Sequence, residues 1–106
     1  MEVDSDKLGA LVGTVVGDMG AAMSGALVVL GDKLGLYKAL AAQGPAMPGD
    51  LAARTGCAER YVREWLSAQA AGGYIQYDKA SGQFSLSPEQ AVVFAAEGHP
   101  AFMAGG

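Results

Sequence analysis

Apolar side chains in the first third of the chain recur at the spacing of an α-helix. Between residues 6 and 30 nearly all of them are separated by three or four positions, and this spacing predicts one long helix. Eight positions share it: Leu8, Leu11, Val12, Val15, Met19, Met23, Leu27 and Leu30.

Two shorter helices are expected next, with a break between them. Residues 33–43 form an apolar helical pattern, and the Asp32 carboxylate is placed to cap it. Pro45 and Pro48 then interrupt the chain because each restricts the residue before it. A short helix follows over residues 49–55.

The pattern around Gly56 predicts a helix-turn-helix. Ala52 is small enough for a second helix, over residues 58–72, to cross close to it, and Gly56 supplies the turn. Trp65 belongs to the inner face of that second helix, and the remaining motif positions are Leu51, Val62 and Leu66.

A hairpin and a final helix complete the predicted order. Residues 74–78 and 83–87 alternate apolar and polar positions on either side of the turn sequence KASG. Ser87 and Pro88 then read as the N-cap and first position of a last helix. The resulting fold class is mainly α with a small β-hairpin wing, a winged helix-turn-helix preceded by a long N-terminal dimerisation helix.

Domain boundaries follow from this order. We expect one winged-helix domain over residues 1–95, with the helix-turn-helix at about 48–72 and the wing at about 74–87. Residues 96–106 are expected to begin a linker to a catalytic domain that this sequence does not contain.

Composition narrows the classes of partner. The net charge of −4 gives no basic footprint for nucleic acid or an anionic lipid surface. Cys57, the single cysteine, excludes an internal disulfide and fits a reducing, cytoplasmic location. No secretory signal is evident, because Glu2 and Asp4 stand where such a signal needs cations.

The long apolar helix raises the question of a membrane span. Its length is sufficient, since a span needs about 20 residues. Asp18, however, lies near its middle and costs about 2.5 to 3.5 kcal/mol on an insertion scale. The flanks carry one Asp and one Lys on each side and give no orientation bias. We therefore expect no membrane span.

A soluble helix must instead explain its glycines. Each one costs about 0.8 to 1 kcal/mol relative to Ala, and close contact with another helix can offset that cost. Small residues recur at every fourth position from Gly9 to Gly25, and on a helix this period drifts by about 40° per step. This stripe of small residues should therefore contact two different neighbours, with the change of face near residues 18–20. We expect a homodimer interface that contains Gly9, Gly13, Val16, Gly17, Gly20, Ala21 and Gly25.

DNA binding is the main alternative for a winged helix. The outer face of the second motif helix pairs Glu59 with Arg63 and Arg60 with Glu64, so its formal charge sums to zero. Nucleic acid is therefore not expected as a partner, because readers of DNA need several cationic contacts to phosphate. Under the alternative interpretation, a DNA-binding transcriptional regulator, the contacts would be Arg60, Arg63, Ser67 and Lys79.

Four segments together resemble one enzyme family. They read GDKLGLYKAL, PGDLAARTG, AERYVREWLSAQAAGGYIQYD and FSLSPEQ. They are similar to the N-terminal winged-helix domain of class I S-adenosylmethionine (SAM)-dependent methyltransferases of the small-molecule, O-methyltransferase-like kind. The resemblance covers about residues 8–95.

The resemblance implies a domain that mediates dimerisation and forms a lid or wall of a substrate pocket. SAM would bind to a following Rossmann-like domain, whose Gly-rich loop is absent here, so this chain alone is expected to bind no cofactor and to have no catalytic residues. A small-molecule substrate would bind only together with the catalytic domain. Candidates for the pocket wall are Met19, Met23, Phe94, Phe102 and Met103.

Several side chains have simpler explanations. Core packing is the ordinary account of Met19 and Met23. His99, the only histidine, has no metal-ligand partner at suitable spacing and reads as a surface-loop residue. A stand-alone dimeric module that binds a small molecule or a protein remains a third function class.

Overall fold

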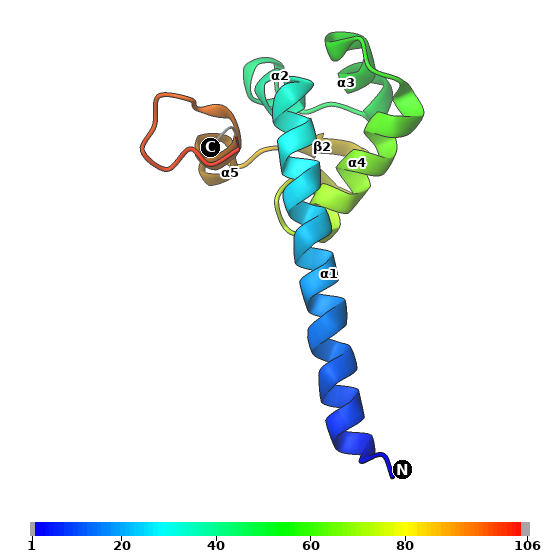
Figure 1. Cartoon of the computed structure of the whole chain (residues 1–106). Coiled ribbons are helices and arrows are strands. Elements are labelled where there is room, and N and C mark those ends of the chain that lie inside the picture. The colour runs from blue at the N-terminus through cyan, green and yellow to red at the C-terminus, as the bar shows by residue number, and fades with distance from the viewer. Residues whose placement is uncertain (1, 105–106) are drawn as a thin grey trace.

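The structure is a computed structural model that describes residues 2–104. Helix α1 (Ser5–Lys33) runs as one uninterrupted helix and projects from the rest of the molecule (Figure 1). The Asp4 side chain caps its start by accepting hydrogen bonds from the backbone N–H groups of Asp6 and Lys7. The predicted long helix is therefore confirmed, and it extends slightly at both ends.

The junction after α1 differs from the prediction. Asp32 lies inside the last turn of α1 and caps nothing, and helix α2 (Leu36–Gln43) begins after Gly35. Gly35 has a φ of 72°, and its N–H donates to the Asp32 carbonyl oxygen at 3.1 Å. A left-handed glycine, rather than a side-chain cap, separates the two helices because it reverses the chain within a single residue.

Helices α3 (Pro48–Thr55) and α4 (Glu59–Ala71) form the predicted helix-turn-helix. Gly56 ends α3 with a φ of 71°, which confirms that this turn favours glycine. Helix α4 has Ala58 at its N-cap and no side-chain hydrogen bond there. The inner-face assignment is also confirmed, since the buried motif residues are Leu51, Ala52, Val62, Trp65 and Leu66.

Strands β1 (Gln76–Asp78) and β2 (Gln83–Ser85) pair antiparallel as the wing. The Asp78 side chain accepts hydrogen bonds from the Ala80 N–H and the Ser81 hydroxyl, which hold its pKa below the usual value. Ala46 exchanges two backbone hydrogen bonds with Phe84 on the free edge of β2. The proline-rich break thus adds an isolated β-bridge to the edge of the wing, which the sequence did not indicate.

Helix α5 (Pro88–Ala95) starts with the capping box expected of its sequence. The Ser87 side chain accepts from the Gln90 N–H, and the Gln90 side chain accepts from the Ser87 N–H. Beyond α5 the chain turns back, so that the Met103 N–H donates to the Val93 carbonyl oxygen at 2.8 Å. Residues 97–104 therefore lie beside α5 in this structure (Figure 1).

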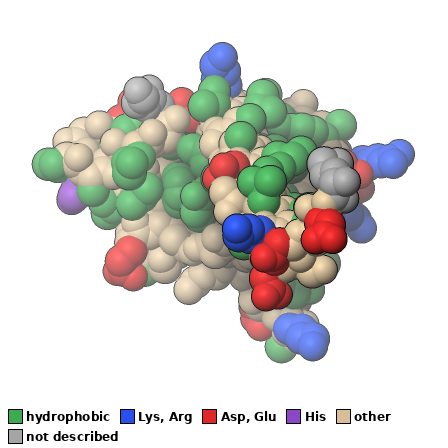
Figure 2. All heavy atoms as spheres, turned by 60° about the horizontal axis from the view of Figure 1, so that its bottom comes forward, with side chains coloured by type: hydrophobic (Ala, Val, Ile, Leu, Met, Phe, Trp, Pro, Cys, Tyr) green, Lys and Arg blue, Asp and Glu red, His purple; other side chains and the backbone are tan. Residues whose placement is uncertain are grey.

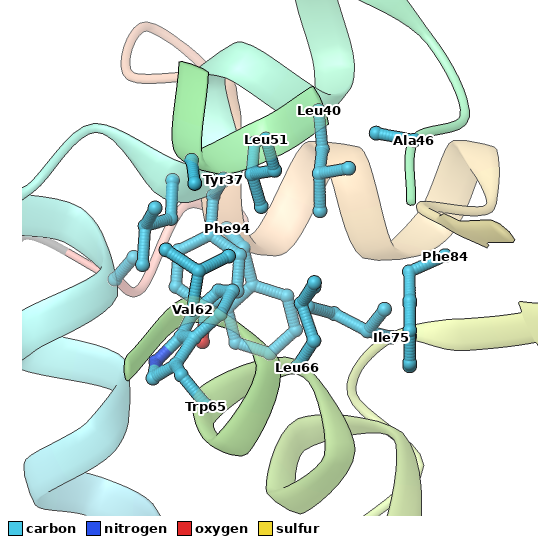
Figure 3. Packing of buried hydrophobic residues seen from close by; sticks show 13 residues of the cluster. Tyr37, Leu40, Ala46, Leu51, Val62, Trp65, Leu66, Ile75, Phe84 and Phe94 are labelled. Carbon is cyan, nitrogen blue, oxygen red and sulfur yellow. The ribbon is translucent and has the colours of Figure 1, made fainter. Parts of the chain in front are cut away.

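The core is built around an aromatic cluster in which Tyr37, Trp65 and Phe94 meet (Figure 3). The Tyr37 ring stacks on Phe94 with centroids 4.8 Å apart and meets Trp65 edge-on at 4.9 Å. The Tyr37 hydroxyl donates to the buried Gln69 side-chain oxygen. Burial raises the pKa of Tyr37 well above its usual value, so the phenol stays protonated.

Only the C-terminal part of α1 touches this core. Leu27 and Val28 are the first residues of α1 that pack against it, and the Trp65 Nε1 group donates to the Leu27 carbonyl oxygen at 2.9 Å. Gly31 is buried, and a Cβ there would lie 2.3 Å from the Trp65 ring. Contact with the core thus begins about two turns after residues 18–20, where the sequence predicts a change of neighbour; that change of neighbour stays a prediction.

Candidate docking surface and the family of the chain

The N-terminal part of α1 has no neighbour. Every residue from 5 to 23 is exposed, and we call this segment the arm. The radius of gyration is 16.6 Å, whereas a compact chain of this length has about 13 Å. The long dimension of 58 Å reflects the same projection. The rest of the described chain, residues 24–104, is called the body.

The predicted interface residues all lie on exposed positions of α1. A Cβ placed on Gly9, Gly13, Gly17, Gly20 or Gly25 would meet no atom within 4 Å. Nothing in the described chain therefore requires these positions to be small. Their role in a dimer stays a prediction.

The arm has two different apolar sides. At about 100° per residue, Gly9, Gly13 and Gly20 lie on the side that continues to the buried Gly31. A separate stripe about 100° away carries the large side chains. Its members in the arm are Leu8, Val12, Val15 and Met19, with exposed fractions of 51%, 52%, 46% and 68%. Figure 2, in which the lower end of Figure 1 comes forward, shows hydrophobic side chains there interspersed with acidic and basic ones.

An apolar groove lies where α1 meets α5 and the C-terminal segment. Its volume is about 450 Å³. Val28 and Val29 form one side, and Val93 and Met103 form the other. The lining is completed by Gly25, Tyr74, Phe94 and Ala104. The groove can accept an apolar group, and it holds no titratable side chain with acid–base character other than the Tyr74 phenol.

The structure separates the predicted pocket-wall residues. Phe94 and Met103 line this groove, but most of the Phe94 ring belongs to the core. Phe102 packs against the core and does not line the groove. Met19 and Met23 are highly exposed on α1, so core packing was the wrong expectation for both. Val93 and Tyr74 were missed because only the tertiary fold brings them together.

The outer face of α4 is neutralised within the helix, as predicted. The Arg63 guanidinium lies 3.3 Å from the Glu59 carboxylate, and Arg60 lies 3.6 Å from Glu64. The Ser67 hydroxyl donates to the Arg63 carbonyl oxygen. Lys79 is exposed in the wing turn. The four residues assigned to DNA contact under the alternative interpretation therefore include only one basic side chain, Lys79, outside these ion pairs.

No metal site is present among residues 2–104. His99 is exposed in the turn after α5, where its Nδ1 accepts a hydrogen bond from the Ala101 N–H. Cys57 lies half-buried between α3 and α4. The two strands of the described residues, β1 and β2, form a short antiparallel hairpin, and neither leads through a Gly-rich loop into a helix.

Helix α1 is long enough and apolar enough to cross a membrane. One such helix is weak evidence for a membrane span, because core helices of soluble proteins and signal sequences can have the same length and composition. No part of its most apolar segment is buried among the described residues.

A match to a known family identifies the family of this winged helix. Residues 22–96 match the family described as the Rv2258c-like winged HTH domain. The chain belongs to that family. The match begins inside α1 and leaves most of the arm outside it. No curated protein matched the chain.

Solved structures place this Rv2258c-like domain among methyltransferases. N,N-8-amino-8-demethyl-D-riboflavin dimethyltransferase (RosA) from Streptomyces davawensis has 26% identity and a TM-score of 0.71, covering 87% of this chain and 26% of RosA. The mitomycin 7-O-methyltransferase MmcR has 23% identity and a TM-score of 0.74, and the match covers 85% of this chain and 26% of MmcR. Human N-acetylserotonin methyltransferase has 15% identity and a TM-score of 0.66, and the match covers 89% of this chain and 27% of the human enzyme.

The chain spans about a quarter of the length of these proteins. It matches the N-terminal domain of class I SAM-dependent methyltransferases, as the sequence resemblance implied. The resemblance to this family is confirmed, and so is the fold class, a mainly helical winged helix-turn-helix preceded by a long N-terminal helix. The dimerisation role of that helix stays a prediction.

Proposed function

We propose that this domain joins two copies of a SAM-dependent methyltransferase and contributes one wall of its substrate pocket. The observation that carries the proposal is the arm, whose large apolar side chains are exposed while the body already has a complete core. Catalysis and SAM binding belong to a separate domain in this proposal.

The arm supports dimerisation because its exposure is costly in water. Burying one Val, Leu or Met side chain gains about 1.5–3 kcal/mol, and the arm presents seven such residues to solvent: Leu8, Leu11, Val12, Val15, Val16, Met19 and Met23. A patch of this extent marks an interaction surface. A second copy supplies an identical apolar surface, and closed two-fold pairs are the commonest soluble assemblies.

The groove supports the pocket-wall role. It is apolar and lies at the end of the body where residues 97–104 return beside α5. Substrate pockets are lined mainly by apolar side chains, and a wall formed by Val93 and Met103 would favour an apolar substrate group. It would bind that group only when a catalytic domain closes the other side.

Sedimentation equilibrium of the 106-residue chain tests the dimer. We expect a dimer at tens of micromolar and a shift towards monomer when Val12 is changed to Asp. A matched control, Ala53→Asp on the exposed side of α3, should leave the dimer intact. A clean monomer at this concentration would overturn the dimer proposal.

Two further observations test the methyltransferase assignment. A coding frame that continues beyond Gly106 into a strand and a Gly-rich loop would support it, and a stop codon with no methyltransferase domain nearby would contradict it. In such a longer enzyme, Met103→Asp should raise KM more than it lowers kcat. Calorimetry should detect no SAM binding to the 106-residue chain alone.

A further inference from the structure

The large side chains of the arm follow the spacing of a two-helix seam. Leu8, Val12, Val15 and Met19 are separated by four, three and four residues, and all four are exposed. This is the spacing at which one helix packs against another over two heptads. The small-residue side of the arm has only Val16 as a large apolar side chain beside its glycines.

We propose that two arms pair antiparallel along this seam, with Leu8 beside the partner's Met19 and Val12 beside the partner's Val15. Positions 8 and 19 are symmetric about the same midpoint of the helix as positions 12 and 15. One antiparallel register therefore sets large side chains against each other at every level. The inference rests on the proposed dimerisation and names its geometry.

The charges of the arm favour the antiparallel direction. Lys7 and Asp18 are eleven residues apart, about three turns, and so lie along one edge of the seam. In an antiparallel pair the same edges of the two helices meet, which brings Lys7 towards the partner's Asp18. Their levels differ by only two residues, about 3 Å, and a lysine side chain spans that distance.

A parallel pair lacks this complementarity. Opposite edges meet in that arrangement, and the edge opposite Asp18 contains Gly9, Gly13 and Gly20, with no Lys or Arg. Asp18 would then be set against an apolar edge without a counter-ion. The apolar seam is compatible with either direction, and the charge pattern favours the antiparallel one.

The position of the body fits this register. In the proposed register Ser5 of one copy reaches the level of residue 22 in the other, which is before Leu27, the first residue of α1 that packs on the core. The two bodies then lie at opposite ends of the helix pair without collision. Increasing the overlap of the two helices by one heptad would bring the two Asp18 side chains within one helical turn of each other. It would also set Ala22 and Ala26 of each copy against Val12 and Leu8 of the other.

Disulfide trapping tests whether the two arms pair antiparallel and which side of each arm forms the interface. In a Cys57→Ser background, the variants Leu8→Cys and Met19→Cys are oxidised separately and as a mixture, with a size tag on one of them. We expect a cross-linked mixed pair and little cross-linking of either variant alone. Two copies of position 8 would lie about 16 Å apart along the axis, beyond the reach of a disulfide.

The matched control uses the small-residue side. Gly9→Cys mixed with Gly20→Cys occupies comparable levels of the helix and should not cross-link. Self-linking of Leu8→Cys would establish a parallel pair, and linking of the glycine-site pair would assign the interface to the small residues. Either result overturns the proposed seam while leaving dimerisation in place, whereas a monomeric unmodified chain removes both proposals.

Charge reversal gives an independent readout. Lys7→Asp or Asp18→Lys alone should raise the dimer dissociation constant about three- to tenfold, as expected for two exposed ion pairs. The double variant Lys7→Asp/Asp18→Lys should restore it, and Lys33→Asp outside the seam should have no effect. A double variant as weak as its single parents would contradict the antiparallel ion pairs.

Discussion

The body and the arm use the same residue types in opposite circumstances. In the body, Gly31 is small because the Trp65 ring occupies the space of its Cβ. In the arm, a Cβ placed on Gly13 would meet no described atom within 4 Å. Contacts within the described chain therefore account for the glycine at position 31 but not for the glycine at position 13.

The two regions also differ in what keeps them helical. Helix α4 is held by the buried Trp65 and Leu66, and tertiary burial of this kind supplies most helical stability in proteins. The arm has no such packing, and its glycines each lower helix propensity by about 0.8 to 1 kcal/mol relative to Ala. We therefore expect the arm to be the least stable helix until a partner covers it.

The largest expected effect separates the regions by truncating one side chain in each. Trp65→Ala should lower the free energy of unfolding by about 3–5 kcal/mol, because it leaves a cavity in the core and removes the hydrogen bond to the Leu27 carbonyl oxygen. Met19→Ala should change it by less than about 0.5 kcal/mol. Urea unfolding at a concentration low enough for monomers would measure both, and equal losses would contradict the division into body and arm.

A pair of glycine substitutions should change stability in opposite directions. Gly31→Ala should lower the free energy of unfolding by about 1–3 kcal/mol, because the new methyl group overlaps the Trp65 ring. Gly13→Ala should stabilise the helical arm by up to about 1 kcal/mol. Thermal unfolding followed by circular dichroism would compare them. A stabilising Gly31→Ala would show that α1 does not pack on α4 as described.

Tyr37 makes the stability of the body depend on pH in the alkaline range. Because burial raises its pKa in the folded state, the native chain keeps a proton that the unfolded chain loses above about pH 10. The contribution of Tyr37 to the free energy of unfolding is thus fully present below that pH, and it declines as the pH rises further. Tyr37→Phe should reduce this alkaline decline, while costing about 1–2 kcal/mol at neutral pH because Gln69 loses its partner. An unchanged alkaline slope in urea titrations would contradict the assignment.

The smallest expected effect concerns nucleic acid. A mobility-shift assay at about 50 mM salt, where phosphate contacts are strongest, should show no shift with the body's winged helix. The reason is the ion pairing of Arg60 and Arg63 within α4. A shift that disappears in Arg60→Ala/Arg63→Ala would instead support the DNA-binding alternative.

The sequence predicted those features that local chemistry determines. Gly56, the capping box at Ser87 and the inner face of α4 follow from turn geometry, capping and helical period, and all were found. It failed where a distant neighbour decides. The role of Gly31 depends on Trp65, and the strand-like pairing of Ala46 depends on the edge of β2. For the same reason Met19 and Met23 were expected in the core, since an apolar pattern does not reveal whether its partner is in the same chain.

Hydrogen exchange measured at low and high protein concentration tests the central claim most directly. If a second copy covers the arm, amide protection between residues 5 and 23 should rise with concentration, while protection in α4 should stay constant. Protection in the arm that does not depend on concentration would contradict the account.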